Sequence, residues 1–74
     1  NPSTTIEFNL PLQSQVSLEI YDILGRKLET IVSENLSAGE HSYRWDATRY
    51  SSGVYIYRLS TTKNVSIKKM SLIK

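Results

Sequence analysis

The sequence has no cysteine and only three glycines among its 74 residues. Without cysteine, no disulfide can stabilise the fold, and no thiolate can serve as a nucleophile or a metal ligand. The glycines form no glycine-rich phosphate loop. No segment approaches the roughly 20 apolar residues of a membrane-spanning helix, and residues 1–10 lack the basic start and apolar block of a signal peptide. The length allows one domain, residues 1–74, and we expect any export signal to lie upstream of it.

Residues that could form an active site are equally scarce. His41 is the only histidine, and its place on the apolar face of a predicted strand favours a packing role. Glu40 and Asp46 are nearby acids, but His41 and Asp46 point to opposite faces of one strand, which disfavours a shared metal ion. There is no Gly-x-Ser-x-Gly motif and no base for a catalytic triad. The sequence therefore predicts a domain with no catalytic activity, cofactor or metal.

Apolar and polar residues alternate along most of the chain, which is the period of a half-buried strand. The alternation is clearest in residues 6–10, 16–20, 41–45 and 54–59. In the last of these segments Arg58 marks the outer face, so Tyr55, Tyr57 and Leu59 are expected to face the core. No segment supports a helix, because the nearest candidate, residues 28–36, contains three adjacent β-branched residues and no cap.

Turn residues separate these segments at intervals of about 8–12 residues, a spacing typical of a sandwich or barrel. Asp22 and Gly25 suit the two ends of a four-residue turn, where Gly25 can adopt a positive φ. Gly39 lies in the next break, and Gly53 opens the most strand-like segment. The pattern predicts an all-β fold, a small immunoglobulin-like sandwich of about seven antiparallel strands. We expect its most buried residues to include Phe8, Leu18, Ile20, Trp45, Tyr55 and Leu59.

Six tyrosine and tryptophan residues are many for so short a chain. An exposed row of such rings could stack on sugars, so a carbohydrate-binding or accessory module of a secreted glycoside-active enzyme is the alternative function. Tyr43 and Trp45, however, occupy alternate positions and share the face that the pattern assigns to the core. A buried Trp supplies the bulk that a disulfide-free sandwich needs, so we favour a structural role for these rings.

The net charge is only +2, but it is unevenly distributed. All seven acidic residues lie in residues 1–46, whereas residues 47–74 contain six basic residues and no acidic one. Such asymmetry indicates either an electrostatic interaction surface or lysines that protect an edge strand from aggregation. The scattered acids of the first part argue against nucleic acid as a partner.

The last predicted strand, residues 65–73, has an ambiguous phase. Val65 and Ile67 share one parity, whereas Met70 and Leu72 share the other. A β-bulge around Lys68 and Lys69 would bring both pairs to one face. We therefore expect a bulge at this point.

Three motifs occur in order along the whole chain. They are Tyr-Asp-x-x-Gly-Arg at residues 21–26, Gly-x-Tyr-x-Tyr-Arg-Leu at residues 53–59 and Lys-Lys-Met-x-Leu-x-Lys at residues 68–74. Together with Asn1-Pro2 and Trp45-Asp46, they make the chain resemble the C-terminal sorting domain of the type IX secretion system, of the type A Por secretion family. The sequence also resembles the immunoglobulin-like domain of the flagellar hook-capping protein, which supports the fold and not the function.

The resemblance to sorting domains implies a role in protein secretion by bacteria of the Bacteroidetes. Such a domain is the signal by which the outer-membrane translocon recognises a cargo that lies N-terminal to it, and a sortase-like peptidase then removes the domain in many members. The expected location is the periplasm in transit, and then the outer-membrane surface or the medium. Any cleavage site is expected to lie before Asn1.

The resemblance also directs attention to the end of the chain. We expect the last strand to be an edge strand whose terminal motif is recognised by the translocon, through Lys68, Lys69, Met70, Leu72 and Lys74. A second group of motif residues is expected to act through turns and packing, with Arg26 either paired to Asp22 or Glu19 or exposed for recognition. This structural group comprises Asp22, Gly25, Arg26, Gly39, Trp45, Gly53 and Tyr55.

Overall fold

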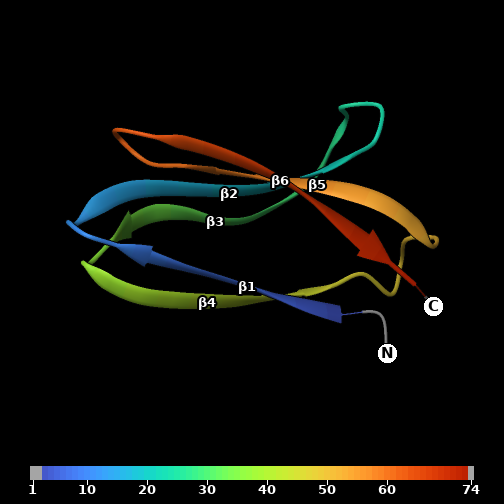
Figure 1. Cartoon of the computed structure of the whole chain (residues 1–74), viewed down its shortest axis with the longest axis horizontal. Helices are drawn as coiled ribbons and strands as arrows, with labels where there is room; N and C mark the ends of the chain where they lie inside the picture. Colours follow the sequence, from blue (N-terminus) through green and yellow to red (C-terminus); the bar gives the residue numbers. More distant parts are fainter. Residues whose placement is uncertain (1–2, 74) are drawn as a thin grey trace.

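The chain forms six β-strands and, within residues 3–73, which the computed structural model describes, no helix (Figure 1). No segment of that part of the chain is therefore a helix that could span a membrane. The strands are β1 (Ser3–Leu10), β2 (Ser14–Asp22), β3 (Lys27–Leu36), β4 (Gly39–Asp46), β5 (Gly53–Ser60) and β6 (Val65–Leu72).

The strands form two stacked antiparallel sheets of unequal size (Figure 1). The larger sheet has the order β3-β2-β5-β6, and the smaller sheet pairs β1 with β4. The four strand pairings of residues 3–73 are antiparallel, so the predicted class, an all-β antiparallel sandwich, is confirmed. The described strands number six rather than the expected seven or so.

The core lies between the sheets and is centred on β2. Val16, Leu18 and Ile20 have no exposed surface, because β2 is an inner strand of the larger sheet and the smaller sheet covers it. Trp45 reaches into this core from β4 and is 2% exposed. The core comprises Ile6, Leu10, Val16, Leu18, Ile20, Val32, Trp45, Ala47, Tyr55 and Leu72.

Four of the six residues predicted to be most buried are confirmed, and two are not. Leu18, Ile20, Trp45 and Tyr55 belong to the core, but Phe8 and Leu59 are only half-buried. Phe8 lies on an edge strand, where it stacks on the rings of His41 and Tyr43. Leu59 lines an open hollow at one end of the sandwich. Both side chains lie on the predicted face of their strand, but neighbouring residues cover them only in part.

The connections between strands follow the turn chemistry of the sequence. Gly25 has φ = 87°, which confirms the positive φ expected for it. Thr61 donates its backbone N–H to the carbonyl oxygen of Asn64 at 2.8 Å, which closes the β5–β6 turn. Residues 28–36 lie in strand β3, as expected, although the β2–β3 pairing has two register shifts.

Candidate functional site

The terminal strand β6 is an edge strand without the expected bulge. Its pairing with β5 runs without a register shift from Val65, opposite Ser60, to Leu72, opposite Gly53. The bulge prediction is therefore wrong. Because the phase is constant, Met70 and Leu72 face inward, while Val65 and Ile67 remain on the outer face and are 54% and 63% exposed.

The two lysines of β6 consequently point to opposite faces of the sheet. Lys68 lies opposite Tyr57 on the inner face, and Lys69 lies opposite Ile56 on the outer face; both lysines are exposed. Met70 is half-buried and Leu72 is buried. Four of the five predicted recognition residues thus lie on one strand but on two faces, and the fifth, Lys74, lies outside the described residues.

The exposed lysines of the β5–β6 hairpin, and Arg44 of β4, lie outside the ion pairs formed within residues 3–73. The arginines of the second half are paired with acids of the first half: Arg49 lies 3.4 Å from Glu29, and Arg58 lies 3.4 Å from Glu19. No ion pair to Lys63, Lys68 or Lys69 occurs among residues 3–73. The asymmetry of the sequence therefore becomes a patch of unpaired lysines at one edge of the molecule.

The β2–β3 turn is held by Asp22 and Arg26. The Asp22 carboxylate accepts hydrogen bonds from the backbone N–H groups of Leu24 (2.9 Å) and Arg26 (3.0 Å), and the Arg26 Nε donates to it at 2.7 Å. The backbone N–H of Arg26, followed by its guanidinium, lowers the pKa of Asp22. Arg26 thus pairs with Asp22 rather than Glu19. The turn presents Ile23 and Leu24 to solvent, 68% and 76% exposed.

Glu19 takes part in a different cluster, on the outer face of the larger sheet. It accepts a hydrogen bond from the Tyr21 hydroxyl at 2.9 Å and lies 3.3 Å from the Lys27 ammonium. The Tyr21 hydrogen bond is the main cause of a lowered pKa at Glu19, with Lys27 and Arg58 acting in the same direction. This cluster ties β2 to its two neighbours, β3 and β5.

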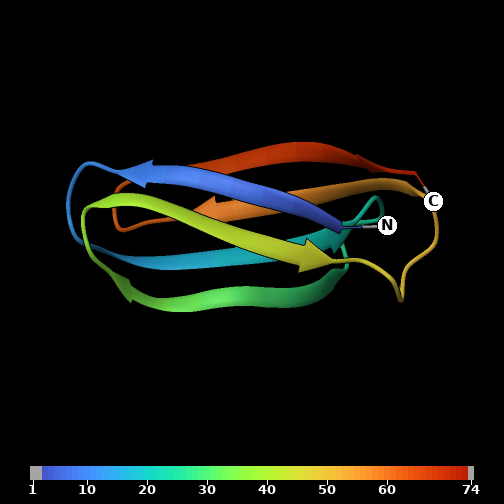
Figure 2. The same cartoon turned by 90° about the horizontal axis from the view of Figure 1, so that it is seen from below.

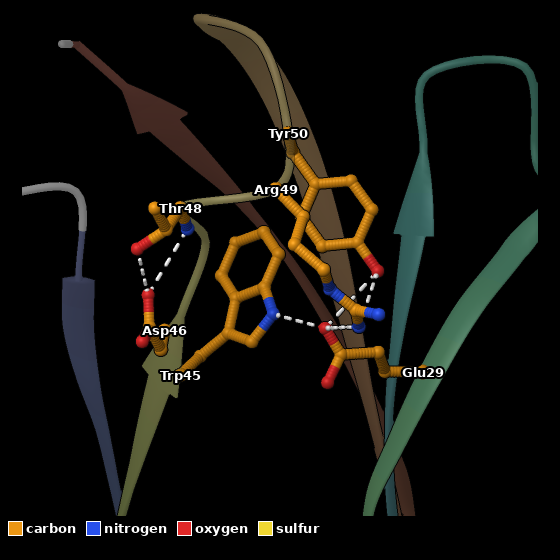
Figure 3. Close-up of polar contacts among 6 residues, drawn as sticks. All are labelled: Glu29, Trp45, Asp46, Thr48, Arg49 and Tyr50. Carbon is orange, nitrogen blue, oxygen red and sulfur yellow. Dashed lines mark hydrogen bonds and ion pairs between the residues drawn. The ribbon is translucent and has the colours of Figure 1, made fainter.

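Glu29 is a structurally important residue that the sequence reasoning missed. Its Oε2 accepts hydrogen bonds from the Trp45 indole N–H at 3.0 Å and from the Tyr50 hydroxyl at 3.1 Å, beside the Arg49 guanidinium (Figure 3). Burial and Glu29 raise the pKa of Tyr50. Because Glu29 belongs to β3 and Trp45 to β4, this carboxylate joins the two sheets. No signal in the sequence pointed to this role, because the position of Glu29 opposite the core residue Ile20 follows from the strand register of the fold.

The β4–β5 loop is fixed next to this cluster. Asp46 accepts hydrogen bonds from the backbone N–H of Thr48, at 3.0 Å, and from its hydroxyl (Figure 3). The Thr48 hydroxyl is the largest cause of a lowered pKa at Asp46. Tyr50 and Tyr55 pack with Trp45 at centroid distances of 5.7 and 5.5 Å. Trp45 and Tyr55 are therefore packed together in the core.

None of the six Tyr and Trp residues is exposed. Trp45 and Tyr55 are buried, and Tyr21, Tyr43, Tyr50 and Tyr57 are half-buried. His41 stacks on Phe8 at 5.5 Å and its Nε2 donates to the carbonyl oxygen of Ser37 at 2.8 Å, so it is a packing residue. Within residues 3–73, no group of three His, Cys, Asp or Glu side chains could hold a metal ion.

Comparison with protein-family models identifies a match over the whole chain. The family model described as "Secretion system C-terminal sorting domain" matches residues 1–74. No curated protein and no solved structure matches the chain significantly.

Proposed function

This chain belongs to the family of secretion system C-terminal sorting domains, and we propose that its terminal strand β6 is the part that the type IX machinery recognises. The domain is a sorting signal, through which a cargo is secreted across the outer membrane to the cell surface or beyond. A sorting signal needs a presented surface and no reaction centre. The observation that carries the proposal is that Lys68 and Lys69, on the exposed edge strand β6, have no ion pair within residues 3–73.

The buried and the exposed side chains of β6 have different roles, anchoring and contact. Leu72 is buried, and Met70 lies half-buried on the same face, so these residues hold the strand on the core. Lys68 and Lys69 are exposed and unpaired among the described residues, so their charge is available to an acidic receptor. Lys74 belongs to the same proposed contact.

The proposal includes partners that the family implies. The domain is attached to a cargo on its N-terminal side, passes through the periplasm, and binds the outer-membrane translocon. A sortase-like peptidase then acts on the protein. The domain itself contributes no catalysis, and the family is not known as a catalytic one.

A secretion assay tests the role of the lysines. The domain is fused to the C-terminus of a reporter in a type IX-competent host, and Lys68→Ala, Lys69→Ala and the triple variant with Lys74→Ala are compared. We expect the triple variant to be retained in the cell while its stability changes by no more than about 0.5 kcal/mol, as for most exposed substitutions. Lys63→Ala, in the β5–β6 turn, is the matched control and should be secreted normally.

The opposite result has a clear meaning. If the folded triple variant reaches the medium as well as the parent does, the lysines of β6 are not the signal. Recognition must then lie in the backbone of the edge or elsewhere on the sandwich. Circular dichroism of the purified variants separates this outcome from a loss of folding.

A further inference from the structure

The two layers of the sandwich do not match in width. Among residues 3–73, two strands cover a sheet of four, so the inner face of β6 extends beyond the edge of β1 that no described strand pairs with (Figure 2). The burial of inward-facing residues reflects this. Leu18, on β2, has no exposed surface, whereas on β6 Met70 is half-buried and Lys68 is exposed although it faces inward.

The region between β1 and β6, called the seam below, has a hollow at each end. One hollow, of about 250 Å³, is lined by Thr4 of β1 and by Met70 and Leu72 of β6. The other, of about 270 Å³, is lined by Leu10 of β1, Leu59 of β5 and Ser66 of β6, among others. The seam therefore follows β1 from its first residues to its last, with apolar side chains at both ends and Lys68 between them.

The edge of β1 lacks the features that usually prevent strand pairing. Natural edge strands are protected by charged residues, prolines, bulges or covering segments. β6 carries two adjacent lysines, β4 carries three charged residues, and the pairing of β3 with β2 is interrupted by two register shifts. In β1 the only charged residue is Glu7, there is no proline, and the pairing with β4 is continuous over eight residues.

We propose that the free edge of β1 accepts an extended segment of a partner protein as a third strand of the smaller sheet. Main-chain hydrogen bonds to β1 supply affinity, and alternate side chains of the added strand enter the seam. The added strand covers the inner face of β6. This inference rests on the proposed function in one respect, since the partner strand belongs to the secretion machinery and lies over Lys68.

The lining of the seam defines the chemistry of this partner. No acidic side chain of residues 3–73 lines either hollow; Lys63 lines the second hollow, and Lys68 lies on β6 between Ser66 of one hollow and Met70 of the other. The inward-facing positions of the partner therefore carry an apolar residue, an acidic residue and an apolar residue in turn. The acid pairs with Lys68, and the apolar residues fill the two hollows. The outward-facing positions are polar.

A peptide with this pattern tests the proposal. The probe is a nine-residue peptide with Leu-Thr-Glu-Thr-Leu at its centre, added at millimolar concentration to the isotopically labelled 74-residue chain. We expect amide shifts and slowed hydrogen exchange in β1, with shifts at Lys68 and Met70. Lys68→Glu should weaken binding about tenfold, because an attraction becomes a repulsion. Lys69→Glu, on the opposite face, is the matched control and should change binding less than about twofold.

Several outcomes would overturn the proposal. One is the absence of slowed exchange in β1 at saturating peptide, and another is equal binding of a peptide whose backbone amides are N-methylated at alternate positions. Equal losses for the two lysine variants would indicate a general charge effect. A free domain that sediments as a dimer and excludes the peptide would assign this edge to a second copy. If the peptide binds as expected but Lys68→Ala is secreted normally, only the proposed function fails.

Discussion

Replacing Glu29 by Ala removes the carboxylate that joins β3 to β4. The Trp45 indole N–H then has no acceptor in a site where the residue is only 2% exposed. An unsatisfied buried donor costs about 1–3 kcal/mol, and the lost Tyr50 contact adds less because that residue is half-buried. We expect a loss of about 2 kcal/mol. A domain of this length has a total stability on the order of 4–11 kcal/mol, so the midpoint of thermal unfolding should fall by roughly 8–16 °C.

The assay is urea unfolding followed by far-UV circular dichroism, which remains usable when the only Trp is replaced. Glu29→Ala, Trp45→Phe and the double variant form a cycle, and we expect a coupling energy of about 1–2 kcal/mol between the two side chains. Glu34→Ala, at an exposed position of the same strand, is the control and should cost less than about 0.5 kcal/mol. A coupling energy below about 0.3 kcal/mol would refute the claim that this hydrogen bond ties the sheets together.

Three further predictions concern other parts of the fold. Leu72→Ala should lower the free energy of unfolding in urea by about 2–5 kcal/mol because the side chain is buried. Ile67→Thr, on the exposed outer face, should change it by less than about 0.5 kcal/mol. Similar losses for the two variants would indicate that both side chains are buried, as a bulge in β6 would require. Gly25→Ala should destabilise by about 1–2 kcal/mol because φ is 87°, and an unchanged midpoint would show that the turn can rearrange. The lowered pKa values of Asp22 and Glu19 stabilise the folded state above the ordinary carboxyl pKa of about 4. This contribution is lost as the pH falls through the lower pKa of the folded state. The decrease in the free energy of unfolding on acidification, measured by urea unfolding at several pH values, should therefore be smaller in Asp22→Asn than in the parent.

The sequence pattern predicted strands and faces well wherever a polar residue marked the outer side. Arg58 did so in β5, and its neighbours Tyr55 and Leu59 face inward as expected. The same method failed in β6, because isolated apolar residues are common on protein surfaces. Val65 and Ile67 are such residues, and a bulge was invoked to bury side chains that the fold leaves exposed.

Long-range partners could not be predicted from alternation alone. Glu29 meets Trp45 and Tyr50, which follow it by 16 and 21 residues, only because β3 and the end of β4 lie in facing sheets. The pattern also gave no sign that β1 pairs with β4 or that the two sheets differ in width. The Asp22 turn was predictable because all of its contacts are local, within four residues of the chain.

The start of β1 and the end of β6 lie at the same end of the sandwich, where Ser3 and Ile73 line one hollow (Figures 1 and 2). Tension applied between the two ends of the chain acts across the strands rather than along them. It peels β1 from β4 and β6 from β5, and the hydrogen bonds of each pair break one after another instead of sharing the load. We therefore expect the domain to resist such tension less than it would resist a force applied along its strands.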